Sequence, residues 1–298
     1  MSNEKSQISS DIQSETDAQL MALDWVGMSD IQSQISVDLN VFVPVLIGAF
    51  VNLKKGYRGI HMSRLYSLMT EKILNQDLTV LKLKNFLTDM IKSQEQLSDQ
   101  SYISLNFNLP RKTKSLKSES VGFRNYPVQI TAQKKGDQTM VWCDFEIIYS
   151  STCPQSAALS LEVIKNQKSQ IEQLERLPAT PHAQRSLMKI SCLFMTSEVD
   201  TSITNLLNKF IETTENTLKT TVQTAVKKAD EMQFAILNSE NLMFCEDAVR
   251  RVSLVMNDLV QSQLFGLNGY KIRTAHLESL HPHNAVSQVA KNYVNQPN

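Results

Sequence analysis

The stretches Tyr126–Gln133 (YPVQITAQ) and Met140–Tyr149 (MVWCDFEIIY) stand on either side of Lys134-Lys135-Gly136-Asp137. Apolar and polar residues alternate through both stretches, which is the period of a half-buried β-strand. The Gly-Asp pair between them is typical of a tight hairpin turn. We therefore predict two antiparallel strands, the second of which delivers Cys153 at its carboxyl end.

Further strands and helices are predicted on both sides of this hairpin. Val41–Leu53 is an apolar, β-branched run between polar stretches, so we expect a buried strand. Apolar residues recur at helical spacing from Leu83 to Met90 and again from Ile203 to Ile211. The other expected elements are helices over residues 60–74, 156–177 and 242–264, strands over 102–109, 185–196 and 270–277, a solvated loop or otherwise a phosphate-attracting edge over 110–120, and a short helix with a polar tail at the end.

The expected helices cluster between antiparallel strands, which is typical of the α+β class. The order of strand, paired helices and strand occurs twice, so we expect two related modules of antiparallel sheet with paired helices. The first covers residues 23–177, with a helical insertion at its end, and the second covers 178–298. Residues 1–22 are rich in Ser, Gln, Asp and Glu, and we expect them to be disordered.

Composition narrows the range of partners. The 298-residue chain has a formal net charge of zero, which argues against a protein that holds nucleic acid by bulk electrostatics. The longest apolar run, Val41–Val51, is too short to span a bilayer, and the first twenty residues lack the apolar core of a signal peptide. We expect a cytoplasmic protein without membrane contact.

The four cysteines differ in their surroundings. Cys143, Cys192 and Cys245 lie within apolar runs, where free cysteine is usually a small buried hydrophobe. Cys153 instead follows Ser150-Ser151-Thr152 and precedes a proline. This position makes Cys153 the candidate for chemistry.

A thiol, a carboxylate and imidazoles stand at the ends of predicted strands: Cys153, His182, Glu278, His281 and His283. Thiolate, imidazole and carboxylate are ligands of zinc, and a catalytic zinc site activates water. Taken one at a time, the same residues read as surface histidines and a structural cysteine. Spacing alone leaves both interpretations open.

Glu246 has a separate possible role, as an acceptor of two parallel hydrogen bonds from the N1–H and the 2-amino group of guanine. The alternative is a solvated glutamate in the first turn of a helix, where the helix dipole favours a carboxylate.

These residues fall within motifs of a known family. The motifs are Asp24-Trp25-Val26-Gly27-Met28, Arg58-Gly59-Ile60-His61-Met62-Ser63-Arg64, Cys153-Pro154-x-Ser156, Ala179-Thr180-Pro181-His182-x-Gln184-Arg185-Ser186, Glu246-Asp247 and Glu278-Ser279-x-His281-x-His283. In this order they resemble the type IB GTP cyclohydrolases, over roughly residues 23–290.

The resemblance implies a tunnelling fold, assembled into a homotetramer with sites at subunit interfaces. It implies opening of the imidazole ring of GTP to give 7,8-dihydroneopterin triphosphate and formate, the first step toward tetrahydrofolate. One zinc or manganese ion per site is implied, and its ligands map to Cys153, His182, Glu278 and His281.

The resemblance also suggests further roles. Glu246 would anchor the purine, and His283 would shuttle protons beside Cys153 and His182. The candidates for binding the rest of the substrate, above all its triphosphate, are Arg185, Ser186, Arg64 and His61. For Arg64 the alternative is a salt bridge on a helix surface.

The chain departs from the family pattern in two places. Gln155 stands where many members carry a second cysteine, and Pro282 and Asn284 flank His283 where many members read Asn-His-Asp. The second change puts the orientation of His283 in doubt.

Two other functions compete with a cyclohydrolase. One is a tunnelling-fold nitrile reductase of the deazaguanine pathway, but its cofactor motif has lysine where this chain has His281. The other is a non-catalytic binder of purine nucleotides. Retention of Cys153, His182, Glu278 and His281 together argues against that reading.

Overall fold

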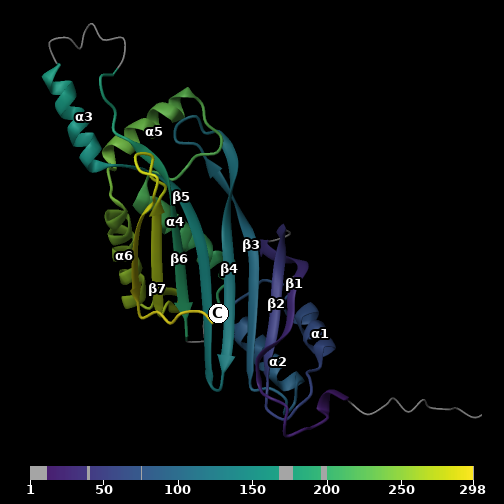
Figure 1. Ribbon diagram of the computed structural model, residues 1–298. Coiled ribbons are helices and arrows are strands. Elements are labelled where there is room, and N and C mark those ends of the chain that lie inside the picture. The colour runs from purple at the N-terminus through teal and green to yellow at the C-terminus, as the bar shows by residue number, and fades with distance from the viewer. Residues whose placement is uncertain (1–11, 39–40, 75, 168–176, 196–199, 298) are drawn as a thin grey trace, which may run out of the picture.

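The computed structural model describes residues 12–38, 41–74, 76–167, 177–195 and 200–297. Among these residues, eight strands form one sheet in which every strand pairs antiparallel with the next along the chain (Figure 1). The strands are β1 (Leu23–Asp38), β2 (Val41–Leu53), β3 (Gln100–Lys114), β4 (Val121–Lys135), β5 (Gln138–Thr152), β6 (Ala183–Phe194), β7 (Gly269–His276) and β8 (Ala285–Lys291). The predicted α+β class is confirmed.

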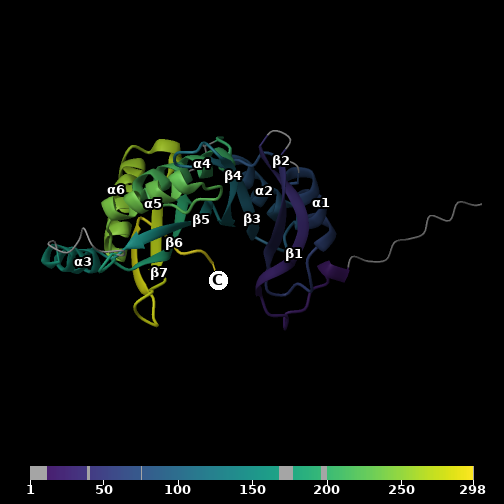
Figure 2. The ribbon, with the colours of Figure 1, turned by 90° about the horizontal axis from the view of Figure 1, so that it is seen from above.

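The helices cover one side of the curved sheet, and α3 projects away from its edge in both views (Figure 2). The helices are α1 (Met62–Lys72), α2 (Val80–Ser93), α3 (Pro154–Asn166), α4 (Ile203–Leu218), α5 (Lys228–Glu240) and α6 (Cys245–Gln261), with short 3-10 turns at Ile12–Ser14 and Leu264–Gly266. Within the described ranges, no helix has the length and apolar character needed to cross a membrane.

The order of elements repeats along the sheet. Two strands, two helices and two strands form the first half, and β5 to β8 with α4, α5 and α6 form the second. The halves meet at the β4–β5 hairpin, where Lys135 pairs with Gln138 and Gly136 adopts a φ of 57°. The expected boundary at residues 177 and 178 stays a prediction, and in this order of elements it lies between α3 and β6.

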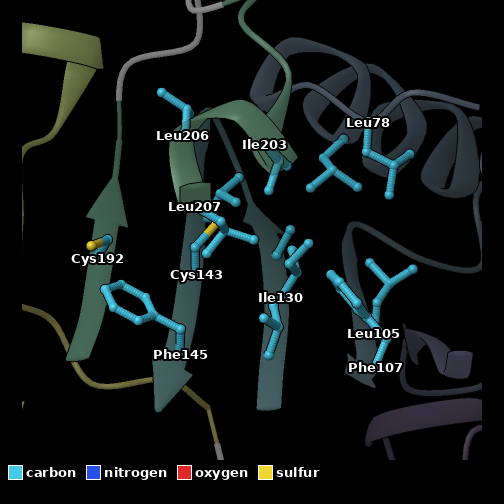
Figure 3. Close-up of a cluster of buried hydrophobic side chains, with 14 of the residues drawn as sticks. Leu78, Leu105, Phe107, Ile130, Cys143, Phe145, Cys192, Ile203, Leu206 and Leu207 are labelled. Atoms are coloured by element: carbon cyan, nitrogen blue, oxygen red, sulfur yellow. The ribbon is translucent and has the colours of Figure 1, made fainter. Parts of the chain in front are cut away.

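The core lies between the helices and the sheet. Figure 3 shows one part of it, where Leu206 and Leu207 of α4 stand over β3 to β6. Cys143 and Cys192 belong to this cluster, and burial raises the pKa of both thiols. Cys245 is also buried, as predicted, and Cys153 alone among the four is half-buried.

Three predicted segments differ in the structure. The end of the chain forms β8 instead of a short helix, because its backbone pairs with β7 from His276↔Ala285 to Tyr270↔Lys291. Residues 110–114 belong to β3, so the loop expected over 110–120 is confined to the turn before Val121. The helix expected over 156–177 ends at Asn166, and residues 168–176 lie outside the described residues.

The N-terminal segment is also corrected in part. Residues 12–22 lie against the turn after β2, where Arg58 N–H donates to the Glu15 carbonyl at 3.2 Å and Asp17 N–H to the Gly56 carbonyl at 2.9 Å. The expectation of disorder over residues 1–22 is therefore wrong for this part, and residues 1–11 lie outside the described residues.

Candidate active site

Three strand ends meet at one edge of the sheet. Antiparallel pairing places Thr152 at the end of β5 beside Ala183 at the start of β6, and Ser186 of β6 beside His276 at the end of β7. Cys153 follows the first strand end and His182 precedes the second, while Glu278 lies two residues beyond β7. The predicted positions at strand ends are confirmed for these three residues.

Cys153 and His182 are joined through their backbones and through Ser156. The Cys153 N–H donates to the His182 carbonyl at 3.2 Å. Cys153 caps α3 by accepting the Ser156 N–H at its Sγ at 3.5 Å, and Ser156 Oγ accepts the His182 N–H at 3.1 Å. The motif serine therefore joins the Cys153 thiol to the His182 backbone, and none of these three hydrogen bonds involves the side chain of Gln155.

Gln184 orients the His182 ring. Its Oε1 lies 3.1 Å from His182 Nδ1, and its Nε2 donates to Ser151 Oγ at 2.8 Å. An amide oxygen only accepts, so His182 Nδ1 is the donor in this contact, and Nε2 takes no part in it. A second-shell acceptor at Nδ1 is the usual partner of an imidazole that binds a metal through Nε2.

Behind this pair lies a buried polar network that the sequence analysis missed. His276 is only 2% exposed, with Nδ1 at 3.1 Å from Ser151 Oγ and Nε2 at 2.9 Å from Tyr149 Oη. Burial lowers the pKa of His276 to about 4, although the charge of Glu246 acts in the opposite direction. The ring is therefore neutral, and the period-2 spacing of Ile272, Thr274 and His276 was the available signal.

Ser186 belongs to this buried network and is not exposed to solvent. It is fully buried, and its hydroxyl lies 2.8 Å from Ser151 Oγ. Within one chain Ser186 is thus engaged with Ser151, and its contact with a triphosphate stays a prediction. The next residue back, Arg185, points to the other face and is exposed, because successive strand residues alternate between faces.

Glu246 comes to the same edge on α6. The segment before this helix is fixed to β5, where the Met243 N–H donates to the Thr152 carbonyl at 3.2 Å. Glu246 lies in the first helical turn, and its Oε2 accepts from the Cys245 thiol at 3.2 Å. Its own backbone N–H and that thiol lower the pKa of the Glu246 carboxyl, so an exposed, ionised carboxylate faces this edge.

The loop after β7 does not complete a metal cluster in one chain. His281 and His283 are exposed, and their rings stack with centroids 5.0 Å apart. Across the described residues, no group of three or more His, Cys, Asp or Glu side chains is placed to hold a metal ion. Cys153 and His182 are thus linked through their backbones, and neither Glu278 nor His281 joins them in a group of three among the described residues.

The remaining candidates lie elsewhere. His61 and Arg64 are at the start of α1, and α1 lies at the opposite end of the molecule from α3 in both views (Figures 1 and 2). Arg64 donates to the Ser93 carbonyl at 2.7 Å and pairs with Glu95 at 2.9 Å. The helix-surface salt bridge is the interaction that forms here, and within one chain Arg64 does not reach Cys153.

The fold has a clear relative among solved structures. Uricase from Arthrobacter globiformis superposes with a TM-score of 0.52 over 93% of this chain and 96% of that chain, at 6% sequence identity. Together with the continuous antiparallel sheet and its paired helices, this likeness defines the class: the chain is a tunnelling-fold protein.

Sequence comparison identifies the family within that class. The family model described as type I GTP cyclohydrolase folE2 matches residues 10–287. GTP cyclohydrolase FolE2 of Pseudoalteromonas translucida is 37% identical over 289 residues, covering 90% of this chain and 92% of that protein. The FolE2 protein of Hydrogenovibrio crunogenus is 36% identical over 299 residues, covering 93% of each chain. The chain belongs to the type I GTP cyclohydrolase FolE2 family.

Proposed function

We propose that this chain is a GTP cyclohydrolase of the type IB subclass. It hydrolyses cyclic amidine C–N bonds of guanine and yields 7,8-dihydroneopterin triphosphate and formate, the first step of tetrahydrofolate biosynthesis. The observation that carries the proposal is the Cys153–His182 pair, which Ser156 holds at the edge where α6 presents Glu246. The relatives named GTP cyclohydrolase FolE2 support the substrate.

A divalent metal, zinc or manganese, is part of the proposal. Bound at the edge, it would supply a Lewis acid that activates water. The Cys153 thiol and the His182 Nε2 fit such an ion by donor type, and Gln184 fixes the ring that offers this nitrogen. Among the described residues of one chain, Glu278 and His281 are not grouped with these two, so the set would be completed by a different placement of residues 277–284 or by a neighbouring copy.

The chain's own groups account for recognition of the base and for proton transfer. The ionised Glu246 accepts the N1–H and the 2-amino group of guanine, and charged paired hydrogen bonds are strong and directional. The exposed Arg185 offers a guanidinium to the phosphates. His283, exposed beside Pro282, transfers protons between water and the substrate.

A homotetramer with sites between subunits is the proposed assembly, in the cytoplasm. The sheet leaves β1 and β8 each with one neighbour among the described strands, and open edges favour pairing with another chain. Exposed Leu159, Leu161 and Val163 on α3 add apolar surface. In such an assembly, His61 and Arg64 would reach the edge from a neighbouring copy.

The test is incubation of the purified, metal-loaded protein with GTP, followed by oxidation and detection of a fluorescent pterin and of formate. We expect both products in equal amounts with zinc or manganese. Absence of pterin with every divalent metal tried would refute the enzyme, and GTP binding without turnover would point to the nucleotide-binding alternative. Oxidation of NADPH with a deazaguanine nitrile would instead favour the reductase.

A further inference from the structure

The buried network behind Cys153 and His182 has hydrogen bonds of fixed direction, which is set at a backbone carbonyl. Thr274 Oγ1 donates to the Leu187 carbonyl at 3.0 Å, so the only proton of this hydroxyl is used there. Tyr149 Oη lies 2.8 Å from the same threonine oxygen and must therefore donate to it. Both side chains are fully buried, so bulk solvent does not compete for these protons.

The ring of His276 continues this direction. The proton of Tyr149 is already donated, so its oxygen accepts at 2.9 Å from His276 Nε2. The other ring nitrogen, Nδ1, has one partner among the described residues, Ser151 Oγ at 3.1 Å. Both nitrogens contact hydroxyl groups and the side chain is 2% exposed, and such surroundings disfavour a charged imidazole. A neutral ring with its proton on Nε2 accepts at Nδ1, so Ser151 donates to it.

Ser151 in turn decides how the amide of Gln184 is oriented. Its single proton is used on His276, so Ser151 Oγ can only accept from its other neighbours. These are Ser186 Oγ at 2.8 Å and Gln184 Nε2 at 2.8 Å. The amide nitrogen of Gln184 must therefore face Ser151, and the amide oxygen faces His182 Nδ1 at 3.1 Å. An amide turned the other way would place its oxygen against a hydroxyl that has no proton left to donate.

We propose that this chain of hydrogen bonds sets which nitrogen of the His182 ring carries a proton. The positioning residues are Thr274, Tyr149, His276 and Ser151, and they act through Gln184. An acceptor held at Nδ1 keeps a proton there, and a neutral ring then has its lone pair on Nε2, where the proposed metal would bind. A turned amide would present N–H to Nδ1, move the proton to Nε2 and block that metal. The inference rests on the proposed function for the role of His182 as a ligand.

Thr274→Val tests the direction, because it removes the anchoring hydroxyl and keeps the shape of the side chain. Tyr149 is then free to donate to His276 Nε2, so the ring should carry its proton on Nδ1 and the bonds beyond it should reverse. Thr214→Val is the matched control. Thr214 is 1% exposed, and its hydroxyl donates to a backbone carbonyl of α4 at 2.8 Å.

Solid-state ¹⁵N NMR of the metal-free protein, labelled only at histidine, reads the proton position on each ring. The chain has five histidines, and His182→Gln and His276→Gln assign the two signals that matter. We expect protons on His182 Nδ1 and His276 Nε2 in the parent protein and in Thr214→Val, and on the opposite nitrogens in Thr274→Val. Zinc titrations should show about tenfold weaker binding by Thr274→Val and unchanged binding by the control.

Gln184→Glu in the Thr274→Val background should restore most of the lost zinc affinity, because a carboxylate accepts at both oxygens in either orientation. If Thr274→Val does not fold, Tyr149→Phe takes its place, since it also frees His276 Nε2 from its acceptor.

The same proton positions in the parent protein and in the network variant would overturn the inference, as would a parent protein with His276 protonated on Nδ1. A loss of zinc affinity that is equal in Thr214→Val would reduce the network to a structural role and overturn it too. The spectra need neither GTP nor metal, so absence of pterin formation would refute the proposed function and leave this result standing.

Discussion

The two halves of the sheet share one order of elements but bury different side chains near their helices. In the first half, α2 buries Val80, Leu83, Phe86, Leu87 and Met90 against apolar strand residues. In the second half, the ends of β5, β6 and β7 bury Tyr149, Ser151, Gln184, Ser186, Thr274 and His276, each hydrogen-bonded to another member.

This difference distinguishes side chains that stabilise the fold from side chains that orient the candidate active site. Burying polar groups costs free energy unless they are paired, so a paired network gains little over an apolar core. It does hold neighbouring side chains in fixed orientations, as Gln184 does for His182. Both halves supply apolar packing, since α4 also buries Leu206, Leu207 and Phe210. The second half carries in addition the polar network that positions the Cys153–His182 pair.

The largest expected effect is on turnover, in the second half. Cys153→Ala should lose pterin formation by about 10³-fold or more, because the proposed water-activating ion loses a ligand. Metal content by mass spectrometry of the native protein should fall with it. The thermal unfolding midpoint should stay close to that of the parent protein, since this thiol is only half-buried.

Cys192→Ala is the matched control, because this cysteine is buried in the core. It should keep both metal and turnover while losing some stability. Full activity in Cys153→Ala would show that this thiol is not part of the active site. It would also contradict the assignment of the chemistry to the second half.

The first half should respond in the opposite way. Leu87→Ala removes a fully buried side chain from α2 and should lower the free energy of unfolding by about 3 kcal/mol. kcat per folded molecule should not change, because Cys153, His182 and His283 all lie in the second half. Urea unfolding and GTP turnover measured on the same sample check this, and an equal loss in both would show that the halves are coupled.

Much of this contrast could be predicted from the sequence, and the limits have physical causes. The spacing of the apolar residues in β2 and α2 is enough to predict a strand and a helix. α5 buries only Asp230 and so carries no apolar stripe to detect, and the pairing of β8 with β7 overrides its weak local preference. Cys153 and His182 were predicted as neighbours by motif, but the buried role of Ser186 depends on a register that no single strand encodes.

A smaller effect should separate binding from stability within α6. Glu246→Ala should weaken GTP binding about 30-fold, because a charged acceptor for two guanine donors is lost, while metal content stays the same. Asp247→Ala is the neighbouring control: Asp247 Oδ2 accepts the Phe244 N–H at 3.0 Å and caps the helix. Its loss should cost about 1 kcal/mol of stability without changing GTP affinity. Equal GTP affinity in calorimetric titrations of Glu246→Ala and the parent protein would refute the anchor.

The smallest effect is a pH dependence that only the second half should show. An unfolded histidine titrates near pH 6.5, whereas burial lowers the pKa of His276 to about 4. Between these values the unfolded chain takes up a proton that the folded chain does not. The free energy of unfolding should therefore fall by about 1.4 kcal/mol per pH unit as pH drops below 6.5, and the contribution of His276 should be constant above it.

His276→Gln isolates this contribution, because every other titrating group is common to both proteins. The parent protein should lose its stability advantage over the variant as pH falls from 7 to 5 in urea unfolding. Parallel curves would mean that the pKa of His276 is the same in the folded and unfolded chains, so that the imidazole is protonated inside the fold below about pH 6.5. The hydrogen bonds to Tyr149 and Ser151 would then surround a buried cation facing Glu246, and the network would act by charge instead of as a neutral scaffold for the Cys153–His182 pair.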